Sequence, residues 1–144
     1  MASAQLPPPI ADWFARRGWA PRSHQLGMLE KARAGEHALL IAPTGGGKTL
    51  GGFLPSLVDL HETLSEDAAN PRRKHTLHTL YISPLKALSV DVARNLIEPV
   101  EEMGLGLRIE TRTGDTSASK RQRQRAHPPD ILLTTPEQLS LIHI

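Results

Sequence analysis

The feature that most constrains this chain of 144 residues is the segment Ala-Pro-Thr-Gly-Gly-Gly-Lys-Thr at positions 42–49. It follows a short apolar run at 38–41 and precedes a stretch that can form a helix. Glycines let backbone N–H groups point at phosphate oxygens, and the N-terminus of a helix favours an anion. Lys48 can supply charge for the outer phosphates, and the Thr49 hydroxyl can bind Mg²⁺. We therefore predict a phosphate-binding loop made by Pro43, Thr44, Gly45, Gly46, Gly47, Lys48 and Thr49, although Ala42 stands where the strict pattern has glycine.

The composition excludes several classes of protein and of functional site. The chain has no cysteine, which excludes disulfides, cysteine zinc sites and a catalytic thiol. Its net charge of +2 permits a nucleic-acid partner without requiring one. No apolar run approaches the ~18 residues that a membrane span needs, and the N-terminus lacks the layout of a signal peptide. We expect a cytoplasmic protein in which residues 1–9 are a flexible lead-in and 10–144 belong to one domain.

Apolar spacing and breaker residues predict an alternation of helices and strands. Ser23 is a candidate N-cap, Gly18 and Gly35 are candidate helix stops, and Pro55 should kink or shorten its helix. The expected helices are 10–17, 24–34, 48–64, 85–103, 117–126 and one that begins at 135. The expected strands are 37–42, 77–83, 107–113 and 131–134. This order favours an α/β fold, with a parallel sheet covered by helices on both faces.

Gln25 precedes the loop after an aromatic, glycine and proline lead-in, Phe14, Gly18 and Pro21. A glutamine amide can pair with the N6 and N7 edge of adenine, whereas guanine would leave one amide group unpaired. A buried polar group without a partner costs about 1–3 kcal/mol. Gln25 is therefore a candidate for selecting ATP, and the alternative is an exposed helix glutamine.

Three hydroxyl residues, Ser83, Thr113 and Thr135, are each expected where a strand ends and a helix begins. Such positions can offer hydroxyl and backbone N–H groups to phosphates, and ligands of open α/β sheets bind beyond the carboxyl ends of the strands. Lys86 and Arg112 add positive charge to this edge. Four strand ends on one edge would suit a nucleic-acid backbone. The alternative role for each hydroxyl is helix capping, which is compatible with the first.

These segments together resemble the first half of the first RecA-like domain of a superfamily 2 helicase. The segment 21–25 resembles the adenine-reading Q motif, and 42–49 resembles motif I, where this superfamily usually has alanine first. The segment 83–88 resembles motif Ia of the large helicase-related (Lhr) group, and 112–116 and 134–137 resemble the motifs that follow it. The resemblance covers nearly all of 10–139 and is greatest to the ligase-associated DEXH-box branch.

The resemblance implies an ATP-dependent DNA helicase or translocase of DNA repair, with ATP and Mg²⁺ as cofactors. Its nucleotide would contact Arg22, Gln25 and the loop, with Lys48 and Thr49 as the catalytic pair and Thr49 as a metal ligand. Its nucleic acid, single-stranded or partly duplex DNA with RNA possible, would contact a set of eight residues. These are Ser83, Pro84, Lys86, Arg112, Thr113, Gly114, Thr135 and Pro136. A DNA ligase or nuclease would be a partner of the whole protein.

The resemblance also implies an incomplete P-loop NTPase domain. The Asp-Glu-x-His motif of the family, which supplies the carboxylates for hydrolysis, does not occur in the sequence. We therefore expect an N-terminal fragment that binds nucleotide without turnover, has marginal stability and exposes an apolar face. The final residues 139–144 fit the family poorly.

Three alternatives stay open at this stage. They are an RNA helicase of the same superfamily, a non-catalytic nucleotide-binding module and a small-molecule kinase with a phosphate loop. The basic run at 120–125 is expected to be a solvated helix face, since it has no aromatic residues for stacking on bases. Trp13 and Trp19 are expected to pack in the protein.

Overall fold

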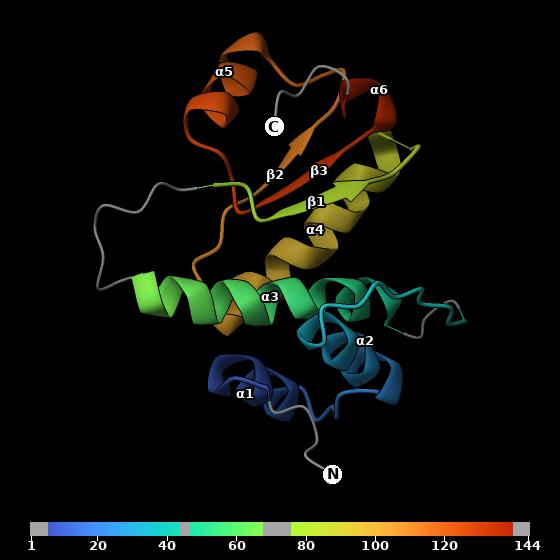
Figure 1. The fold of residues 1–144 in the computed structure, drawn as a ribbon. Helices are drawn as coiled ribbons and strands as arrows, with labels where there is room; N and C mark the ends of the chain where they lie inside the picture. The colour runs from blue at the N-terminus through green and yellow to red at the C-terminus, as the bar shows by residue number, and fades with distance from the viewer. Residues whose placement is uncertain (1–5, 44–46, 68–75, 140–144) are drawn as a thin grey trace. The chain divides into compact units, whose positions relative to one another are not determined.

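The structure is a computed structural model that describes residues 6–43, 47–67 and 76–139. It divides into two compact units. The first contains Met1–Ala69 with Glu102–Leu105, and the second contains Asn70–Glu101 with Gly106–Ile144. Figure 1 shows the helices and strands that make up each unit.

The first unit is built from three helices, α1 (Pro8–Arg16), α2 (Ser23–Arg33) and α3 (Lys48–Asp67). In α1 the predicted apolar face is confirmed, because Ile10, Trp13 and Phe14 are all buried. Helix α2 packs on α3. Apolar side chains of the three helices bury the surface that stabilises this unit; the buried set in them is Ile10, Trp13, Phe14, Leu29, Phe53, Leu54, Leu57, Val58 and Leu60.

The helix boundaries differ from the expected ones at identifiable residues. Helix α1 begins at Pro8, inside the expected lead-in, because proline needs no N–H partner in the first turn. Ser23 is the first residue of α2, so the N-cap is Arg22 and the prediction for Ser23 was wrong. Gly18 ends α1 as predicted, with a φ of 68°. Helix α3 continues past Pro55 to Asp67, so proline does not shorten it.

The two tryptophans lie at the end of α1. Trp13 is buried, and its indole N–H donates to Glu102 Oε2 at 2.6 Å. Trp19 meets the Trp13 ring edge-on at 5.7 Å between centroids, and the Arg17 guanidinium lies 5.4 Å from each centroid. Trp13 therefore packs as predicted, whereas Trp19 packs on its neighbour and keeps 55% of its surface exposed.

The strand predicted at 37–42 is not formed. Residues 37–43 are irregular, and Leu39 and Ile41 are 84% and 83% exposed. A strand exists only where its N–H and C=O groups pair with a neighbour, and among the described residues none pairs with this segment. The local apolar pattern was therefore not sufficient to make a strand.

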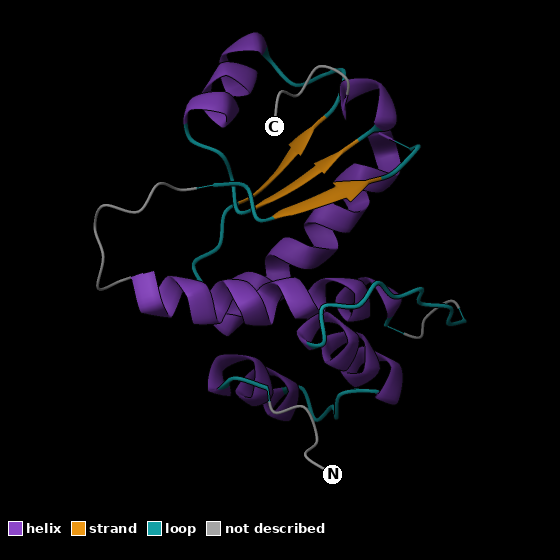
Figure 2. Cartoon of the chain, viewed as in Figure 1, coloured by secondary structure: helices purple, strands orange, loops and turns teal. Residues whose placement is uncertain are grey.

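The second unit contains a parallel sheet of three strands, β1 (Thr79–Ile82), β2 (Ile109–Arg112) and β3 (Ile131–Thr134), in the order β1-β3-β2. Figure 2 shows these strands side by side, with helices around them. All four residues of β3 are buried, as expected of a central strand. The helices are α4 (Lys86–Met103), α5 (Ala118–Ala126) and the short α6 (Pro136–Leu139). This α/β arrangement with a parallel sheet is confirmed, with one strand fewer than predicted.

In the part of the chain that the structure describes, every helix is too short or too polar to span a lipid bilayer.

Candidate nucleotide site and nucleic-acid interface

Gln25 lies in the first turn of α2 and is only 3% exposed. Its Oε1 accepts a hydrogen bond from the Arg22 backbone N–H at 2.8 Å. Its Nε2 donates to the Gly47 carbonyl at 3.3 Å. Both ends of the amide are thus held by backbone groups, one of which belongs to the glycine-rich loop. The alternative of an exposed helix glutamine is excluded.

Gly47 stands directly before α3 and has a φ of 76°, which L side chains rarely adopt. A Cβ added there would lie 2.7 Å from Gln25 Nε2. The Gly47 carbonyl also accepts the N–H of Gly51 at 2.9 Å, which starts the helical ladder. Glycine is therefore favoured at this position by its conformation, and a Cβ would in addition displace the end of the Gln25 side chain, as expected of the close-packed backbone of a phosphate loop.

Lys48 and Thr49 are the first two residues of α3, and both are exposed. Their side chains are accessible at the start of a helix, where the N–H groups of the first turn have no partner within the helix and suit an anion. Pro43 is exposed as well, whereas Thr44, Gly45 and Gly46 lie outside the described residues. Where the chain is described, no cluster of three or more His, Asp or Glu side chains could hold a metal. Of the described residues, those at the start of α3 fit a nucleotide phosphate and a Thr49-bound cation.

The second unit places the predicted interface residues on one row. The register pairs Ile82 with Thr134 and Thr134 with Arg112, so the three strands end level with one another. The next residues along the chain are Ser83, Thr135 and Thr113. Their placement at one carboxyl edge of the sheet confirms the predicted strand-to-helix positions, for three strand ends and not four.

Ser83 and Thr135 both make local contacts at the start of a helix. Ser83 is 2% exposed, and its Oγ accepts the N–H of Leu85 at 2.7 Å ahead of α4. The Thr135 carbonyl accepts the N–H groups of Gln138 and Leu139. The Thr135 side chain also lowers the pKa of Glu137 through a hydrogen bond. Pro84 and Pro136, which follow these two residues, are both exposed.

Thr113 begins a tight turn that continues to Thr116. The Thr113 N–H donates to Thr116 Oγ1 at 2.9 Å, and the Asp115 N–H donates to Thr113 Oγ1 at 3.2 Å. The Thr116 N–H returns to the Thr113 carbonyl at 3.2 Å. Gly114 is exposed between them. We call residues 113–116 the Thr113 turn.

Basic groups converge on the Thr113 turn. Arg112 is 3% exposed, and burial lowers the pKa of its guanidinium, with further lowering by the charges of Arg121 and Arg125. Lys86, the first residue of α4, forms an exposed ion pair with Asp115 of the turn. The ion pair between Lys86 and Asp115 therefore connects the predicted segments 83–88 and 112–116. The sequence analysis did not predict this ion pair.

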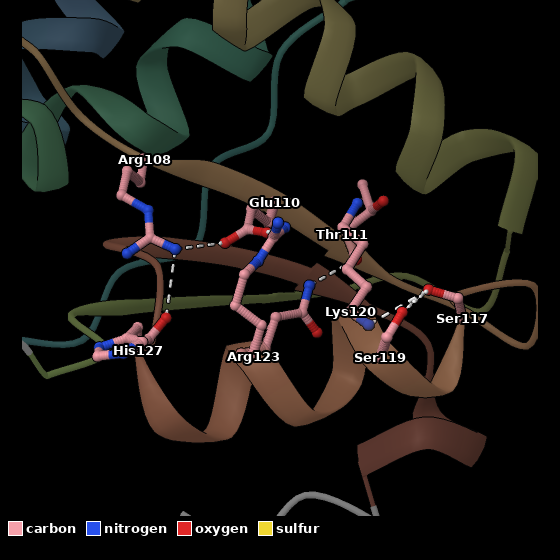
Figure 3. A network of polar contacts seen from close by, with 9 residues as sticks. Arg108, Glu110, Thr111, Ser117, Ser119, Lys120, Arg123 and His127 are labelled. Carbon is pink, nitrogen blue, oxygen red and sulfur yellow. Dashed lines mark hydrogen bonds and ion pairs between the residues drawn. The ribbon is translucent and has the colours of Figure 1, made fainter.

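Helix α5 was expected to be a solvated basic face, and the basic residues of 120–125 are indeed exposed or half-buried, but the expectation missed one buried residue of the run. Gln124 is 6% exposed and donates from Nε2 to the Thr111 carbonyl at 3.1 Å. Arg123 pairs with Glu110 at 3.0 Å, and Glu110 also pairs with Arg108 at 3.1 Å (Figure 3). Gln122 and Gln124 lie two positions apart and therefore on different sides of the helix, so the alternation of glutamines with arginines did not indicate that Gln124 faces a strand edge. Ser117 is the N-cap of α5, and its Oγ accepts the N–H of Lys120 at 3.2 Å.

Comparison with known proteins identifies the family. A family profile described as DEAD/DEAH box helicase matches residues 22–144. The Lhr helicase/uracil glycosylase of Escherichia coli K12 is 43% identical over 145 residues, covering 94% of this chain and 9% of that protein. The ATP-dependent helicase Lhr-Core of Methanocaldococcus jannaschii is 36% identical over 146 residues, covering 94% of this chain and 17% of that protein.

A solved structure agrees with these relatives. The Mycobacterium smegmatis helicase Lhr bound to single-stranded DNA and AMP-PNP has a TM-score of 0.79 and 35% identity, over 96% of this chain and 18% of that chain. The chain thus spans only a small part of the proteins that it matches. It belongs to the DEAD/DEAH box helicase family, with Lhr helicases among its relatives, and its sheet and helices form part of a RecA-like domain.

Proposed function

We propose that this chain is the ATP-binding and nucleic-acid-binding part of an ATP-dependent helicase or translocase that acts on DNA. The observation that carries the proposal is the row of Ser83, Thr135 and Thr113 at one edge of the parallel sheet. A chain with a phosphate loop and no such row would fit a small-molecule kinase equally well. The relative from Mycobacterium smegmatis, whose structure holds single-stranded DNA and AMP-PNP, supports the same reading.

In the nucleotide site, Lys48 would contact the outer phosphates of ATP and Thr49 would bind Mg²⁺. Pro43, Thr44, Gly45, Gly46 and Gly47 would cradle the phosphates. Gly47 supports this role by its positive φ and by its close approach to the end of the Gln25 side chain. A bound Mg²⁺ would neutralise charge on the phosphates during hydrolysis. Lys48 and Thr49 together would bind and orient the reacting group.

Gln25 would select adenine, with Arg22 beside it. The Gln25 amide uses one lone pair of its oxygen on Arg22 and one N–H of its nitrogen on Gly47, which leaves a second lone pair and a second N–H with which it can pair with adenine. Because the same nitrogen donates to Gly47, this pairing would couple the base to the carbonyl of Gly47 in the phosphate loop. Comparing ATP with GTP affinity for wild type and Gln25→Ala tests this role, and an unchanged preference in the variant would remove it.

On the sheet edge, a nucleic-acid backbone would lie across Ser83, Thr135 and Thr113. The exposed neighbours Pro84, Lys86, Gly114 and Pro136 would contribute contacts, and Lys86 would supply charge in exchange for Asp115. The side chains of Ser83, Arg112, Thr113 and Thr135 are all buried, so we assign these side chains to holding the edge in place. DNA is favoured over RNA by the single-stranded DNA in the Lhr relative. A DNA-repair role in the cytoplasm, with a ligase or nuclease as partner, follows only from the resemblance to the ligase-associated branch.

The decisive experiment uses the full-length protein that carries this chain. We expect single-stranded DNA to stimulate ATP hydrolysis and Lys48→Ala to lower the stimulated rate by at least about a hundredfold, because the phosphate charge loses its partner. Single-stranded RNA of the same sequence tests the choice of nucleic acid. Normal turnover by Lys48→Ala would contradict the proposal, and so would hydrolysis that responds to neither nucleic acid.

A further inference from the structure

The free edge of β2 is closed by side chains of α5. Among the described residues, strand β2 pairs with β3 on one side only, and the Arg112 carbonyl on that side accepts the Thr134 hydroxyl at 2.8 Å. Carbonyls alternate along a parallel strand, so those of Thr111 and Thr113 face the opposite side. Both of these carbonyls accept hydrogen bonds from α5.

The two donors are Gln124 and Arg121, three residues apart on one side of α5. Gln124 Nε2 reaches the Thr111 carbonyl at 3.1 Å. Arg121 Nη2 reaches the Thr113 carbonyl at 2.9 Å and the Gly114 carbonyl at 3.4 Å. Helix α5 thus provides, through side chains, the hydrogen bonds that a further strand would have provided. Figure 3 shows the neighbouring contacts between α5 and β2.

The contact made by Arg121 differs from the others because it extends beyond the strand. It links two successive carbonyls at the start of the Thr113 turn, where Thr113 is 5% exposed and Gly114 is exposed. Both hydrogen bonds come from Nη2, whose two N–H bonds lie in the plane of the guanidinium and so have fixed directions, whereas the three N–H bonds of a lysine ammonium rotate about a flexible stem. Fixing these carbonyls also fixes the peptide planes that carry the N–H groups of Gly114 and Asp115.

We propose that Arg121 is a positioning residue for nucleic-acid binding, which holds the Thr113 turn in the shape that receives a phosphate without itself contacting the phosphate. This inference rests on the function proposed above, since it concerns the same sheet edge. A turn that is ordered before binding loses less conformational entropy on binding, and affinity rises accordingly. Arg121, which donates to two carbonyls of the turn, therefore differs in role from Arg125, which is exposed one turn further along the same side of α5.

The test compares Arg121→Gln, Arg121→Lys and Arg125→Gln in the full-length protein. Arg125 is the matched control, because it lies one turn further along α5, carries the same charge and is exposed. We expect both Arg121 variants to bind single-stranded DNA about tenfold more weakly than wild type, with ATP affinity unchanged. We expect Arg125→Gln to bind within about twofold of wild type.

The salt dependence of binding separates positioning from direct contact. Each phosphate that a protein neutralises contributes about 0.7 to the slope of log affinity against log salt for a single strand. The slope should therefore stay at the wild-type value in Arg121→Gln although the affinity falls. A slope smaller by about 0.7 would show that Arg121 contacts a phosphate, and would overturn the proposal.

Two other outcomes would also overturn it. One is full recovery of affinity by Arg121→Lys, which would show that charge alone is sufficient. The other is an equal loss in Arg125→Gln, which would show that the helix acts only through its total charge. If wild type itself fails to bind single-stranded DNA, the proposed function fails, and that result is distinct from wild-type binding that Arg121 does not affect.

Discussion

The segment 37–43 and the strand β3 both contain an apolar run, but only β3 forms a strand. Residues 131–134, Ile-Leu-Leu-Thr, are buried between two parallel neighbours. Residues 38–41, Ala-Leu-Leu-Ile, are irregular, with Leu39 and Ile41 more than 80% exposed. Helices in this chain follow local spacing, because their hydrogen bonds close within the segment. Strands require a partner, so the same local signal gives a strand in one unit and a loop in the other.

Truncating side chains in both regions tests this contrast most directly. We expect Ile131→Ala to lower the free energy of unfolding of the chain by about 3–4 kcal/mol, since Ile131 is fully buried and its loss leaves a cavity. The matched change Ile41→Ala should alter it by less than about 0.5 kcal/mol. Urea unfolding followed by circular dichroism measures both. A large loss in Ile41→Ala would show that 37–43 is a buried strand after all.

The exposed apolar side chains give a second test of the contrast. We expect the chain to bind an apolar fluorescent dye, and the double change Leu39→Ser with Ile41→Ser to remove a large part of the signal. The same pair of changes in β3, at Ile131 and Leu133, should raise dye binding, because it disrupts a core. Cooperative thermal unfolding of wild type without any dye binding would contradict the exposed apolar face.

Gly47 lies between the irregular region and α3, and its backbone is held by a positive φ and by the hydrogen bond from Gln25. We expect Gly47→Ala to destabilise the chain by about 1–2 kcal/mol, owing to its positive φ and to the contact with Gln25. Nucleotide affinity should fall as well. The control is Gly52→Ala in the interior of α3, where a Cβ meets open space and should stabilise by up to about 1 kcal/mol. Equal effects of the two changes on nucleotide binding would contradict a special role for Gly47.

Gln124 tests how the edge of the sheet is closed. Gln124→Leu removes the hydrogen bond to the Thr111 carbonyl, but it also removes a buried Oε1 that has no hydrogen-bond partner among the described residues. These effects oppose each other, so we expect a net loss of only about 1 kcal/mol in the free energy of unfolding. Exposed Gln122 offers the matched control, Gln122→Leu, with no loss. Faster amide exchange along β2 in Gln124→Leu alone would agree with a loosened edge.

The smallest expected effect on stability is the pH dependence that Glu102 contributes. Hydrogen bonds from Arg17 and Trp13 lower the pKa of this carboxyl below its ordinary value of 4.5. A lowered pKa means that the stabilisation is fully present above pH 4.5 and is lost as the pH falls through the folded-state value. Thermal unfolding of Glu102→Gln should show a flatter pH dependence below 4.5 than wild type. Parallel curves would show that the contact contributes nothing.

Much of the fold could be predicted because its determinants are local. The apolar face of α1, the stop at Gly18 and the strand 131–134 all follow from spacing or from a residue's conformational limits. The row of Ser83, Thr135 and Thr113 was also accessible, since parallel strands place their carboxyl ends on one edge. The family motifs gave the same positions independently.

The failures concern contacts between distant residues. Lys86 and Asp115 meet across the sheet edge, and Gln25 meets Gly47 across 22 positions. Helix α5 was predicted to be solvated because most residues of 120–125 are charged. The structure places one uncharged residue of this run, Gln124, against strand β2. Such contacts depend on three-dimensional placement, and no local pattern encodes them.

The level ends of the three strands have a consequence for insertions and deletions. Side chains alternate between the faces of a strand, so removing one residue within 79–82 would shift Ser83 off the row or turn the whole strand over. A single codon lost from β1, β2 or β3 should therefore be far more damaging than most substitutions at the same positions. The alignment of the three strand ends thus depends on the number of residues in each strand more than on the identity of most of their side chains.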